Sequence, residues 1–405
     1  MTRGEDSNLT NLTGGSLSGK VAIVVTHVRE QRPTHHLEAF LVQRCHTVLS
    51  IYHPLLIDVS AKSRYQLFVN GTLVAAGERT LRGPEVAIRV QEVILTVKWV
   101  RQFTHRSDLF FGIDALNCIS GLLLRPFVRI QKVIFYVIDW SPRRFNNVVL
   151  NGIYHLTDRV SALFANEIWN VSPVIDSGRW KGRLWSLIGQ MSKNKTKIVG
   201  IGVPQPSSDL STVMRIPHRL VFLGHLLEKQ GLQIVIQALP EIAQLFSDVE
   251  LLVIGDGPYQ FELQALVRSL LVSDRVTFLG YVEDESDVLR HLASASVGVA
   301  PYLELEDSFT QYADPGKLKN YLAAGLPIIV TRVPYNAEYL EQSGCAILVK
   351  ATERDIVDAV CRLFDEDPTK QSIRRAKARA FVGELDWVSV FSKAMNVINA
   401  EDNAD

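Results

Sequence analysis

The stretch DPGKLKNYLAAGLPIIVT, residues 314–331, decides the fold. Asp314 and Pro315 suit the N-cap and the first position of a helix, because aspartate accepts free N–H groups and proline needs no donor there. Gly325 suits the left-handed residue just past the end of a helix. The apolar run at 328–330 is typical of a parallel strand covered on both faces. The stretch therefore predicts a short helix that leads directly into a buried strand.

The start of this expected helix suits an anion. A helix N-terminus presents free N–H groups and a partial positive charge, which together favour phosphate. At about 100° per residue, Lys317 and Asn320 share one face, while Leu318 and Tyr321 cover the arc that would face a core. Lys317 is therefore a candidate phosphate ligand. The alternative is a capped surface helix with a solvated lysine.

Apolar strands and helical segments alternate regularly along residues 218–385. The expected strands are RLVFLG (219–224), VELLVIG (249–255), RVTFLG (275–280), ASVGVAP (295–301), LPIIVT (326–331) and CAILV (345–349). This alternation predicts a doubly wound parallel sheet, in which ligands bind beyond the carboxyl ends of the strands. Glycines that end several strands allow a backbone to approach a ligand closely.

Composition divides the chain into five segments. We expect a disordered tail (1–19), an N-terminal α/β domain (20–204), a Pro/Ser-rich linker (205–217), a C-terminal α/β domain (218–385), and a C-terminal helix and tail able to pack back on the first domain (386–405). In the first domain, the Asn70-Gly71 dipeptide predicts a β-hairpin. Residues 174–192 are predicted to form a helix.

The charge of the chain is unevenly distributed. The 405 residues are 47% hydrophobic with a mean hydropathy of +0.10, enough for two or three domains. Residues 1–204 contain 25 Lys and Arg against 14 Asp and Glu, whereas residues 205–405 contain 18 against 29. The basic half could face an anionic membrane, a polyphosphate or a nucleic acid. Because the chain has no aromatic–basic signature of a nucleic-acid-binding fold, we expect no nucleic-acid partner.

Targeting and redox signals favour a cytoplasmic protein. The four cysteines are far apart and lack metal or redox spacing, so we expect them to be reduced. Residues 1–19 are polar and unlike a signal peptide, and no stretch is apolar enough to span a bilayer. Residues 178–197 mix Trp and Leu with Arg and Lys, which can lie on an anionic membrane surface. The commoner explanation is an amphipathic helix packed on the core.

Four segments together resemble a known family. They are VFLGHLLEKQGL (221–232), LLVIGDGP (251–258), VTFLGYV (276–282) and the stretch at 314–331. The combined pattern resembles the GT-B glycosyltransferases of the retaining type called family 4 or group 1, over roughly residues 219–390. The resemblance implies an α/β protein with two Rossmann-like doubly wound domains facing a cleft. It also implies a nucleotide-sugar donor, UDP- or GDP-linked, as substrate, with no cofactor, no metal and no protein nucleophile.

The resemblance also implies a donor site. Its residues would be Gly224, His225, Lys229, Gly255, Gly257, Gly280, Tyr281, Asp314, Lys317 and Asn320. Lys229 and Lys317 would stabilise the departing diphosphate. The chain departs from the family at the usual pair of glutamates, where Tyr312 and Asn320 stand. It also departs in the first loop, which carries His225 and Gln230 where arginine and lysine are usual.

The first domain would hold the acceptor. Asp139 ends an expected strand and could orient or deprotonate an acceptor hydroxyl, the alternative being a helix cap or an ion pair with Arg143 or Arg144. The family often places a useful histidine in this domain, and His27 and His36 follow the first strand. The predicted function is transfer of a sugar, with retention, to a glycan or lipid-linked acceptor at the cytoplasmic membrane face. The alternatives are a non-catalytic member of the family and a nucleotide-sugar epimerase.

Overall fold

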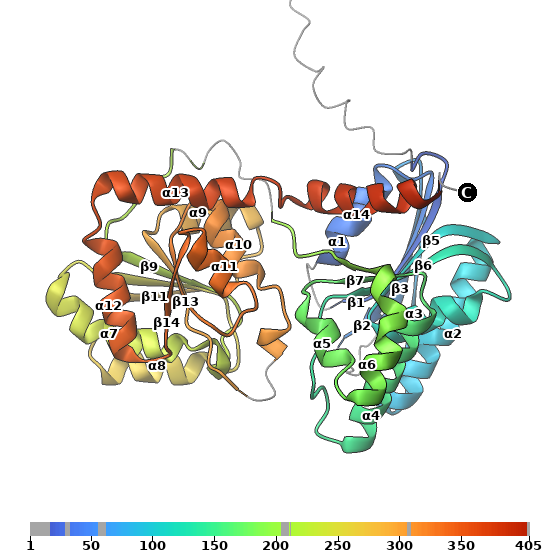
Figure 1. Cartoon of the computed structure of the whole chain (residues 1–405), viewed down its shortest axis with the longest axis horizontal. Helices are drawn as coiled ribbons and strands as arrows, with labels where there is room; N and C mark the ends of the chain where they lie inside the picture. The colour runs from blue at the N-terminus through green and yellow to red at the C-terminus, as the bar shows by residue number, and fades with distance from the viewer. Residues whose placement is uncertain are drawn as a thin grey trace, which may run out of the picture. The chain divides into compact units, whose positions relative to one another are not determined.

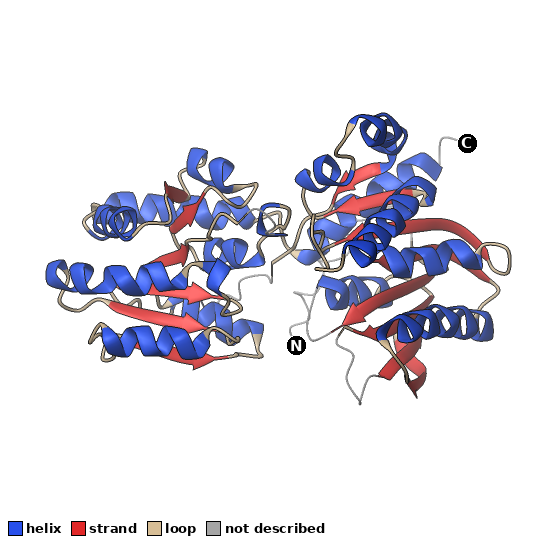
Figure 2. Cartoon of the chain, turned by 90° about the horizontal axis from the view of Figure 1, so that it is seen from below, coloured by secondary structure: helices blue, strands red, loops and turns tan. Residues whose placement is uncertain are grey.

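The computed structural model describes residues 17–28, 33–55, 62–203, 210, 212–305 and 309–402. The chain forms two compact units, one made of the chain up to Gly200 together with Val388–Asp405, and the other of Ile201–Trp387. Each unit is a sheet with helices packed against it (Figures 1 and 2). The α/β class with two doubly wound units is therefore confirmed. Of the expected tail and linker, residues 1–16, 205–209 and 211 lie outside the described residues.

The first unit contains an eight-stranded sheet in the order β4-β3-β2-β1-β5-β6-β7-β8. All pairings are parallel except those that β3 makes with β2 and β4. The strands are β1 (Val21–Val28), β2 (Thr47–Pro54), β3 (Lys62–Val69), β4 (Thr72–Thr80), β5 (Arg106–Ile113), β6 (Arg129–Val137), β7 (Glu167–Asn170) and β8 (Thr196–Ile198). The β3–β4 hairpin turns at Asn70 and Gly71, both with positive φ, as predicted. The chain order reverses between β1 and β5, which makes that position the switch point of the sheet.

Helices cover the faces of the first sheet. They are α1 (Pro33–Val42), α2 (Glu85–Phe103), α3 (Ala115–Leu124), α4 (Val148–Phe164), α5 (Val174–Arg179), α6 (Arg183–Gly189), the 3-10 helix η1 (Gln190–Lys195) and α14 (Trp387–Asp402). The single helix predicted over 174–192 is wrong. The chain breaks it at Gly182, whose φ of 105° no helix allows. Helix α14 lies beside α1 (Figure 1), with the rings of Phe391 and Phe40 5.7 Å apart.

The second unit contains a six-stranded, wholly parallel sheet in the order β11-β10-β9-β12-β13-β14. The strands are β9 (Arg219–Leu223), β10 (Glu250–Ile254), β11 (Val276–Gly280), β12 (Val297–Ala300), β13 (Ile328–Thr331) and β14 (Ala346–Val349). The helices are η3 (Glu228–Gln230), α7 (Leu232–Leu245), α8 (Gln260–Ser269), α9 (Glu285–Ala293), η4 (Phe309–Gln311), α10 (Gly316–Ala323), α11 (Ala337–Gln342), α12 (Glu353–Phe364) and α13 (Pro368–Val382). Two large apolar clusters pack against the sheet, which explains why its strands are continuous apolar runs. The switch point lies between β9 and β12.

The deciding stretch folds largely as predicted. Helix α10 is followed by Gly325 with a φ of 72°, and β13 is fully buried. Leu318 and Tyr321 face the core, both 0% exposed. The prediction that Asp314 caps the helix is wrong, because α10 begins at Gly316 and no side chain caps it.

Candidate functional site

A cavity of about 390 Å³ lies at the switch point of the second unit. It is lined by the end of β9, the residue that follows it, the end of η3, the segment after β12 and the start of α10. The lining residues are Leu223, Gly224, Gln230, Tyr302, Thr310, Ala313, Pro315, Gly316, Lys317 and Asn320. Three of the predicted donor residues, Gly224, Lys317 and Asn320, therefore meet in one cavity. Its position matches the place where open α/β sheets bind ligands.

Lys317 has an unusual environment for a lysine. Its Nζ lies 4.0 Å from the centre of the Phe222 ring and 5.0 Å from that of Tyr302, and donates a hydrogen bond to Gln230 Oε1 at 2.7 Å. No carboxylate pairs with it among the described residues. Burial lowers the pKa of Lys317 to about 7. The ammonium is thus partly stripped of water and lacks an anion, so a bound phosphate would supply its missing counter-charge.

Two uncharged side chains accompany Lys317. Gln230 accepts the hydrogen bond from Lys317 Nζ and so holds the ammonium in place. The sequence analysis noted Gln230 only as the residue that stands at the usual lysine position of the first loop. The side-chain amide of Asn320 has no hydrogen-bond partner among the described residues and lines the same cavity. Asn320 can therefore offer both a donor and an acceptor to a ligand.

The glycines that follow the strands of the second sheet have two different roles. A Cβ on Gly224 would lie 3.1 Å from the Lys317 side chain, so this glycine leaves room for the lysine. A Cβ on Gly255 would lie 2.1 Å from the Gly224 carbonyl oxygen, and one on Gly257 would lie 2.4 Å from that of Leu226. Those two glycines allow the loops after β9 and β10 to pack on each other. Gly280 accepts a hydrogen bond from the Gly255 N–H at 2.8 Å and extends the same loop layer.

Asp314 is part of the framework and does not line the cavity. It is 5% exposed, it pairs with Lys319, and its Oδ2 accepts a hydrogen bond from the Ile201 N–H at 2.7 Å. Its predicted role as a donor ligand is therefore replaced by a structural one. Lys319 is correspondingly engaged, which leaves Lys317 as the lysine that enters the cavity.

The remaining predicted donor residues lie on the same edge of the sheet but outside the cavity lining. His225 is 4.0 Å from Asp256 and well exposed. Lys229 belongs to η3, and its carbonyl accepts the Leu303 N–H. Tyr281 follows β11 and is 52% exposed.

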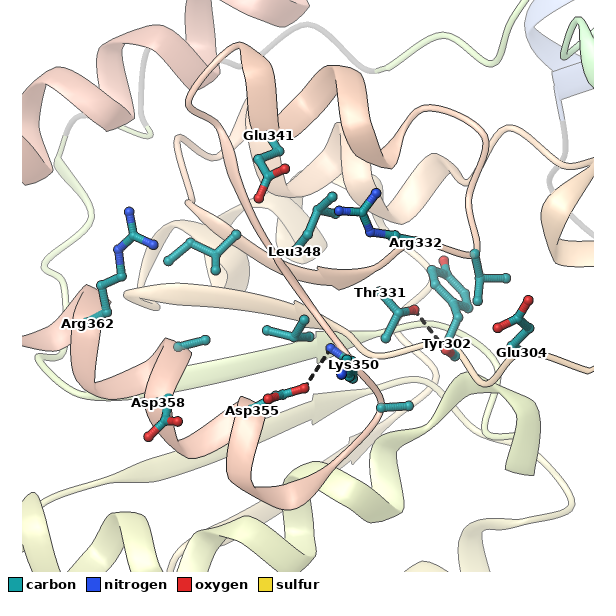
Figure 3. A pocket seen from close by; sticks show the side chains of 15 residues that line it. Tyr302, Glu304, Thr331, Arg332, Glu341, Leu348, Lys350, Asp355, Asp358 and Arg362 are labelled. Carbon is teal, nitrogen blue, oxygen red and sulfur yellow. Dashed lines mark hydrogen bonds between the residues drawn. The ribbon is translucent and has the colours of Figure 1, made fainter.

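A second cavity, of about 660 Å³, lies beyond the carboxyl ends of β12, β13 and β14 (Figure 3). Its side chains are of mixed charge, including Arg332, Lys350, Glu341 and Asp355. Asp355 accepts a hydrogen bond from the Lys350 backbone N–H, and Arg332 pairs with Glu338 outside the lining. No single charge dominates this cavity, in contrast to the one around Lys317.

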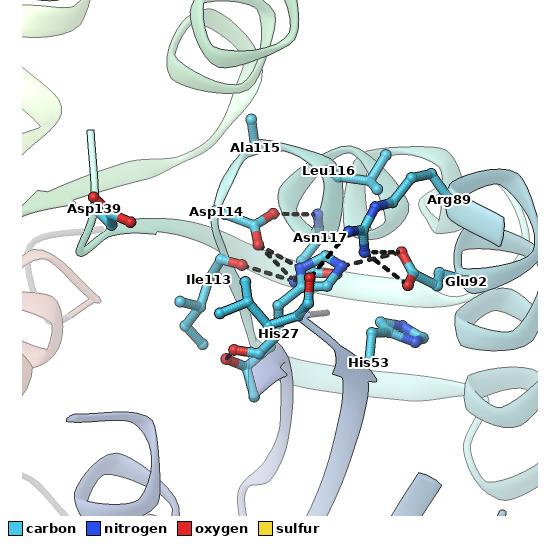
Figure 4. Close-up of polar contacts among 12 residues, drawn as sticks. His27, His53, Arg89, Glu92, Ile113, Asp114, Ala115, Leu116, Asn117 and Asp139 are labelled. Atoms are coloured by element: carbon cyan, nitrogen blue, oxygen red, sulfur yellow. Dashed lines mark hydrogen bonds and ion pairs between the residues drawn. The ribbon is translucent and has the colours of Figure 1, made fainter. Parts of the chain in front are cut away.

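The first unit holds a polar cluster at its own switch point (Figure 4). His27 near the end of β1 places its Nδ1 2.6 Å from Asp114 Oδ2 and its Nε2 3.0 Å from Glu92 Oε2. Arg89 Nη1 in turn donates to Glu92 Oε1 at 2.9 Å. Asn117 donates from its side chain to Asp114 Oδ2 at 3.2 Å. The cluster joins β1, β5, α2 and α3.

The charge state of His27 follows from its two carboxylates. Burial alone would lower the pKa of His27, but Asp114 and Glu92 outweigh it and raise that pKa to about 9. The neighbouring His53 has the opposite shift, because burial and then the charges of His27 and Arg89 hold its pKa well below the usual value. With its pKa raised to about 9, His27 carries a proton on both ring nitrogens at neutral pH, and both N–H groups face carboxylates.

Two other candidates of the first unit lie outside this cluster. Asp139 pairs with Arg144 at 2.6 Å, as the alternative interpretation of the sequence had it. Figure 4 shows it apart from the His27 contacts. His36 lies on α1, and none of the His27 hydrogen bonds involves it. Asp114, which the sequence analysis did not single out, is the carboxylate that reaches the surface here.

The described part of the chain holds no group of three or more His, Cys, Asp and Glu side chains arranged for a metal ion. None of the described helices is long and apolar enough to cross a membrane.

A family model described as Glycosyl transferases group 1 matches residues 217–366. The second unit therefore carries a glycosyltransferase group 1 domain. Among curated relatives, the phosphatidyl-myo-inositol mannosyltransferase of Mycobacterium leprae is 29% identical over 202 residues, which are 49% of this chain and 51% of that protein. A GDP-mannose-dependent α-(1-6)-phosphatidylinositol monomannoside mannosyltransferase of Mycobacterium tuberculosis is 23% identical over 50% of this chain and 53% of that protein. The chain thus spans about half the length of the curated relatives it matches.

Solved structures extend the likeness in fold to both units. Sucrose-phosphate synthase from Thermosynechococcus elongatus aligns with a TM-score of 0.68 and 16% identity, over 95% of this chain and 99% of that one. Anabaena HepE in complex with UDP aligns with a TM-score of 0.66 and 14% identity, over 94% and 100%. The group 1 domain is therefore one of two Rossmann-like units of a GT-B fold. The cavity around Lys317 lies wholly within the matched residues 217–366.

Proposed function

We propose that this chain is a glycosyltransferase that binds a nucleotide-sugar donor in the group 1 domain. The observation that carries the proposal is Lys317, a desolvated ammonium without a carboxylate partner among the described residues, at the switch point and beside the start of α10. A diphosphate would complete this site, because the lysine supplies charge and the first turn of α10 supplies free N–H groups. The curated relatives that act on GDP-mannose support the same class of donor.

In the proposed reaction the anomeric C–O bond of the donor breaks and its electron pair leaves with the diphosphate. Lys317 and the N–H groups at the start of α10 stabilise that developing charge. The acceptor oxygen bonds to the anomeric carbon and its proton passes to the departing phosphate. No carboxylate lines the donor cavity among the described residues. We propose transfer with retention and without a protein nucleophile, as the resemblance to the group 1 family implies. No metal or cofactor enters the proposal.

The first test is binding followed by turnover. The full chain is titrated with GDP-mannose, UDP-glucose and UDP-N-acetylglucosamine, together with the free diphosphates, in a thermal-shift assay. A ligand at about 100 times its dissociation constant should add about 2.7 kcal/mol to the free energy of unfolding. Transfer of labelled sugar to phosphatidylinositol vesicles then tests the lipid acceptor that several relatives' names suggest. Absence of any nucleotide shift would overturn the proposal.

A non-catalytic role is the second candidate. The observation that favours it is Asn320, since an amide in the donor cavity replaces the charge that the family usually places there. It predicts nucleotide binding without transfer or hydrolysis of any donor. Conversion of the donor sugar alone, without an acceptor, would instead identify an epimerase.

We also propose that the first unit associates peripherally with an anionic membrane, at the cytoplasmic face if the chain resides there. Helices α6 and η1 expose Leu184, Leu187 and Met191, each at least 64% exposed, beside the basic residues Arg183 and Lys193. Exposed apolar and basic side chains together favour an anionic lipid surface.

Flotation with phosphatidylglycerol vesicles tests this surface. The double variant Leu184→Ser/Leu187→Ser should lose binding. The matched control Phe261→Ser/Leu245→Ser changes equally exposed apolar residues of the second unit and should retain it. Equal flotation of both variants, or equal binding of the wild type to neutral vesicles, would contradict the proposal.

A further inference from the structure

The His27 cluster runs from the surface of the first unit into its interior. Asp114 has a side chain that is 43% exposed, whereas those of His27 and Glu92 are 8% and 1% exposed. Charge alternates along the cluster, from the Asp114 carboxylate to the imidazolium, to the Glu92 carboxylate and to Arg89. Its most exposed member is therefore the Asp114 carboxylate, ahead of Arg89 at 25%, and buried charged side chains fix it in position.

Two energetically unfavourable features of the fold hold the Asp114 carboxylate in position. Asp114 has a φ of 73° and a ψ of 170°, a backbone conformation that non-glycine residues rarely adopt and that costs about 1–3 kcal/mol. The imidazolium of His27 is buried, which is unfavourable unless its partners are charged. A simple helix cap needs neither feature, because a serine or aspartate with an extended backbone caps equally well.

The third observation is the position of Asp114 at the edge of the first sheet. His27 lies near the end of β1 and Asp114 directly follows β5, so both lie where the chain order of the first sheet reverses. This is the ligand position of an open α/β sheet, and it is equivalent to the place of Lys317 in the second sheet. Asp139 follows the next strand, β6, but its carboxylate is engaged by Arg144.

We propose that Asp114 binds a hydroxyl group of a neutral, hydroxyl-rich ring of the acceptor, and that His27 positions it for that contact. An ionised carboxylate accepts hydrogen bonds and repels anions, so it favours a sugar or cyclitol ring over a phosphate. Oδ2 is taken by His27 and Asn117, and among the described residues Oδ1 accepts only the Asn117 backbone N–H, at 3.2 Å. Oδ1 therefore keeps capacity for the hydroxyl. This inference rests on the proposed glycosyltransferase function, since it assigns the acceptor of that reaction.

The test uses the full chain and saturation-transfer NMR with myo-inositol, methyl α-mannoside and methyl α-glucoside as probes. We expect the wild type to bind at least one of them, and Asp114→Asn to bind it at least about tenfold more weakly, the worth of one charge-assisted hydrogen bond. Glu78→Gln is the matched control, because it removes an exposed carboxylate of the same unit that a salt bridge to Lys62 already occupies. Asp114→Ser, which can still cap α3, replaces Asp114→Asn if the latter fails to fold.

The role of His27 needs a separate readout. His27→Gln should weaken the same probe while leaving nucleotide affinity unchanged. With wild type, probe affinity should be flat between pH 6 and 8 and fall as the imidazolium loses its proton near pH 9. The groups facing His27 are Asp114, Glu92 and Asn117, with neutral His53 beside it and Arg89 beyond Glu92. A merely structural histidine would change stability without this pH profile.

The outcomes separate this inference from the proposed function. Nucleotide binding by the wild type with no binding of any probe, or with equal binding by Asp114→Asn, would overturn the inference and leave the donor site intact. Absence of nucleotide binding by the wild type would instead overturn the proposed function.

Discussion

Replacing Lys317 with methionine should stabilise the empty protein and weaken its donor binding at the same time. The pKa of Lys317 falls from 10.5 to about 7 because burial disfavours its charge. At roughly 1.4 kcal/mol per unit this corresponds to about 5 kcal/mol, which solvent screening of a partly exposed side chain reduces to about 1–3 kcal/mol. Methionine keeps the length of the side chain, retains its contact with Phe222 and removes the charge.

The gain in stability of Lys317→Met over wild type should depend on pH. The folded pKa lies below the unfolded one, so the charged lysine destabilises the fold fully below about pH 7. This penalty shrinks as pH rises towards 10.5 and is absent above it. The melting temperature of Lys317→Met should therefore exceed that of wild type by several degrees at pH 6 and by little at pH 10. The matched control is Lys350→Met, which removes an exposed lysine of the same unit and should change neither value much.

Donor binding should change in the opposite direction. A charge-assisted hydrogen bond is worth about 1.5–3 kcal/mol, so Lys317→Met should bind GDP or UDP about 10- to 150-fold more weakly by calorimetry. In the wild type, binding should take up a proton near pH 8, because the diphosphate restores the charge of the lysine. A variant that melts below the wild type at pH 6, or that binds the diphosphate unchanged, would refute this account of the cavity.

Three further results are expected. Lys319→Ala should weaken diphosphate binding less than Lys317→Ala does. Its free energy of unfolding, measured in urea, should fall by about 3–5 kcal/mol, because Asp314 is then buried without its partner. Equal effects of the two alanine variants on binding would contradict this. His27→Gln should lose roughly 3 kcal/mol of stability below pH 6.5, because the charged imidazole, with its pKa raised to about 9, stabilises the folded state fully there. Above pH 10 the variant should be as stable as the wild type. An equal loss at all pH values would show that the charge of His27 is unimportant. Gly255→Ala should destabilise the second unit by more than about 2 kcal/mol in the same denaturation assay, since its φ is 127° and its Cβ would meet the Gly224 carbonyl oxygen; a neutral result would mean that the two loops can separate.

Local patterns explain why so much of the second unit could be predicted from the sequence. Helix α10, the left-handed Gly325 and the buried strand β13 depend on residues within one short stretch. Their signals are capping chemistry, helical periodicity and a continuous apolar run, none of which needs a distant partner. The side of α10 on which Lys317 lies could be predicted for the same reason, because the face of a helix follows from spacing alone.

The failed predictions depend on contacts between distant parts of the chain. Asp314 has the ideal chemistry for an N-cap, but a partner 113 residues away, the Ile201 N–H, competes for it. Asp114 was not predicted because its significance arises from His27, 87 residues earlier, and from a backbone conformation that composition does not reveal. A helix at 174–192 satisfied the periodicity, but Gly182 interrupts it. Pattern alone cannot rank such competing contacts.

The two switch points show opposite solutions to one electrostatic problem. In the second unit, Lys317 is left without a counter-charge and is partly neutralised by burial, so that site gains most from a ligand that brings negative charge. In the first unit, Asp114 already has its counter-charge in the imidazolium of His27, so a charged ligand would gain little there and a hydroxyl group can use the remaining lone pairs. The difference follows from what lies beneath each group, aromatic rings under Lys317 and a charged framework under Asp114. The proposed assignment, an anionic donor for one unit and a neutral hydroxyl-bearing ring of the acceptor for the other, leaves neither charge unsatisfied.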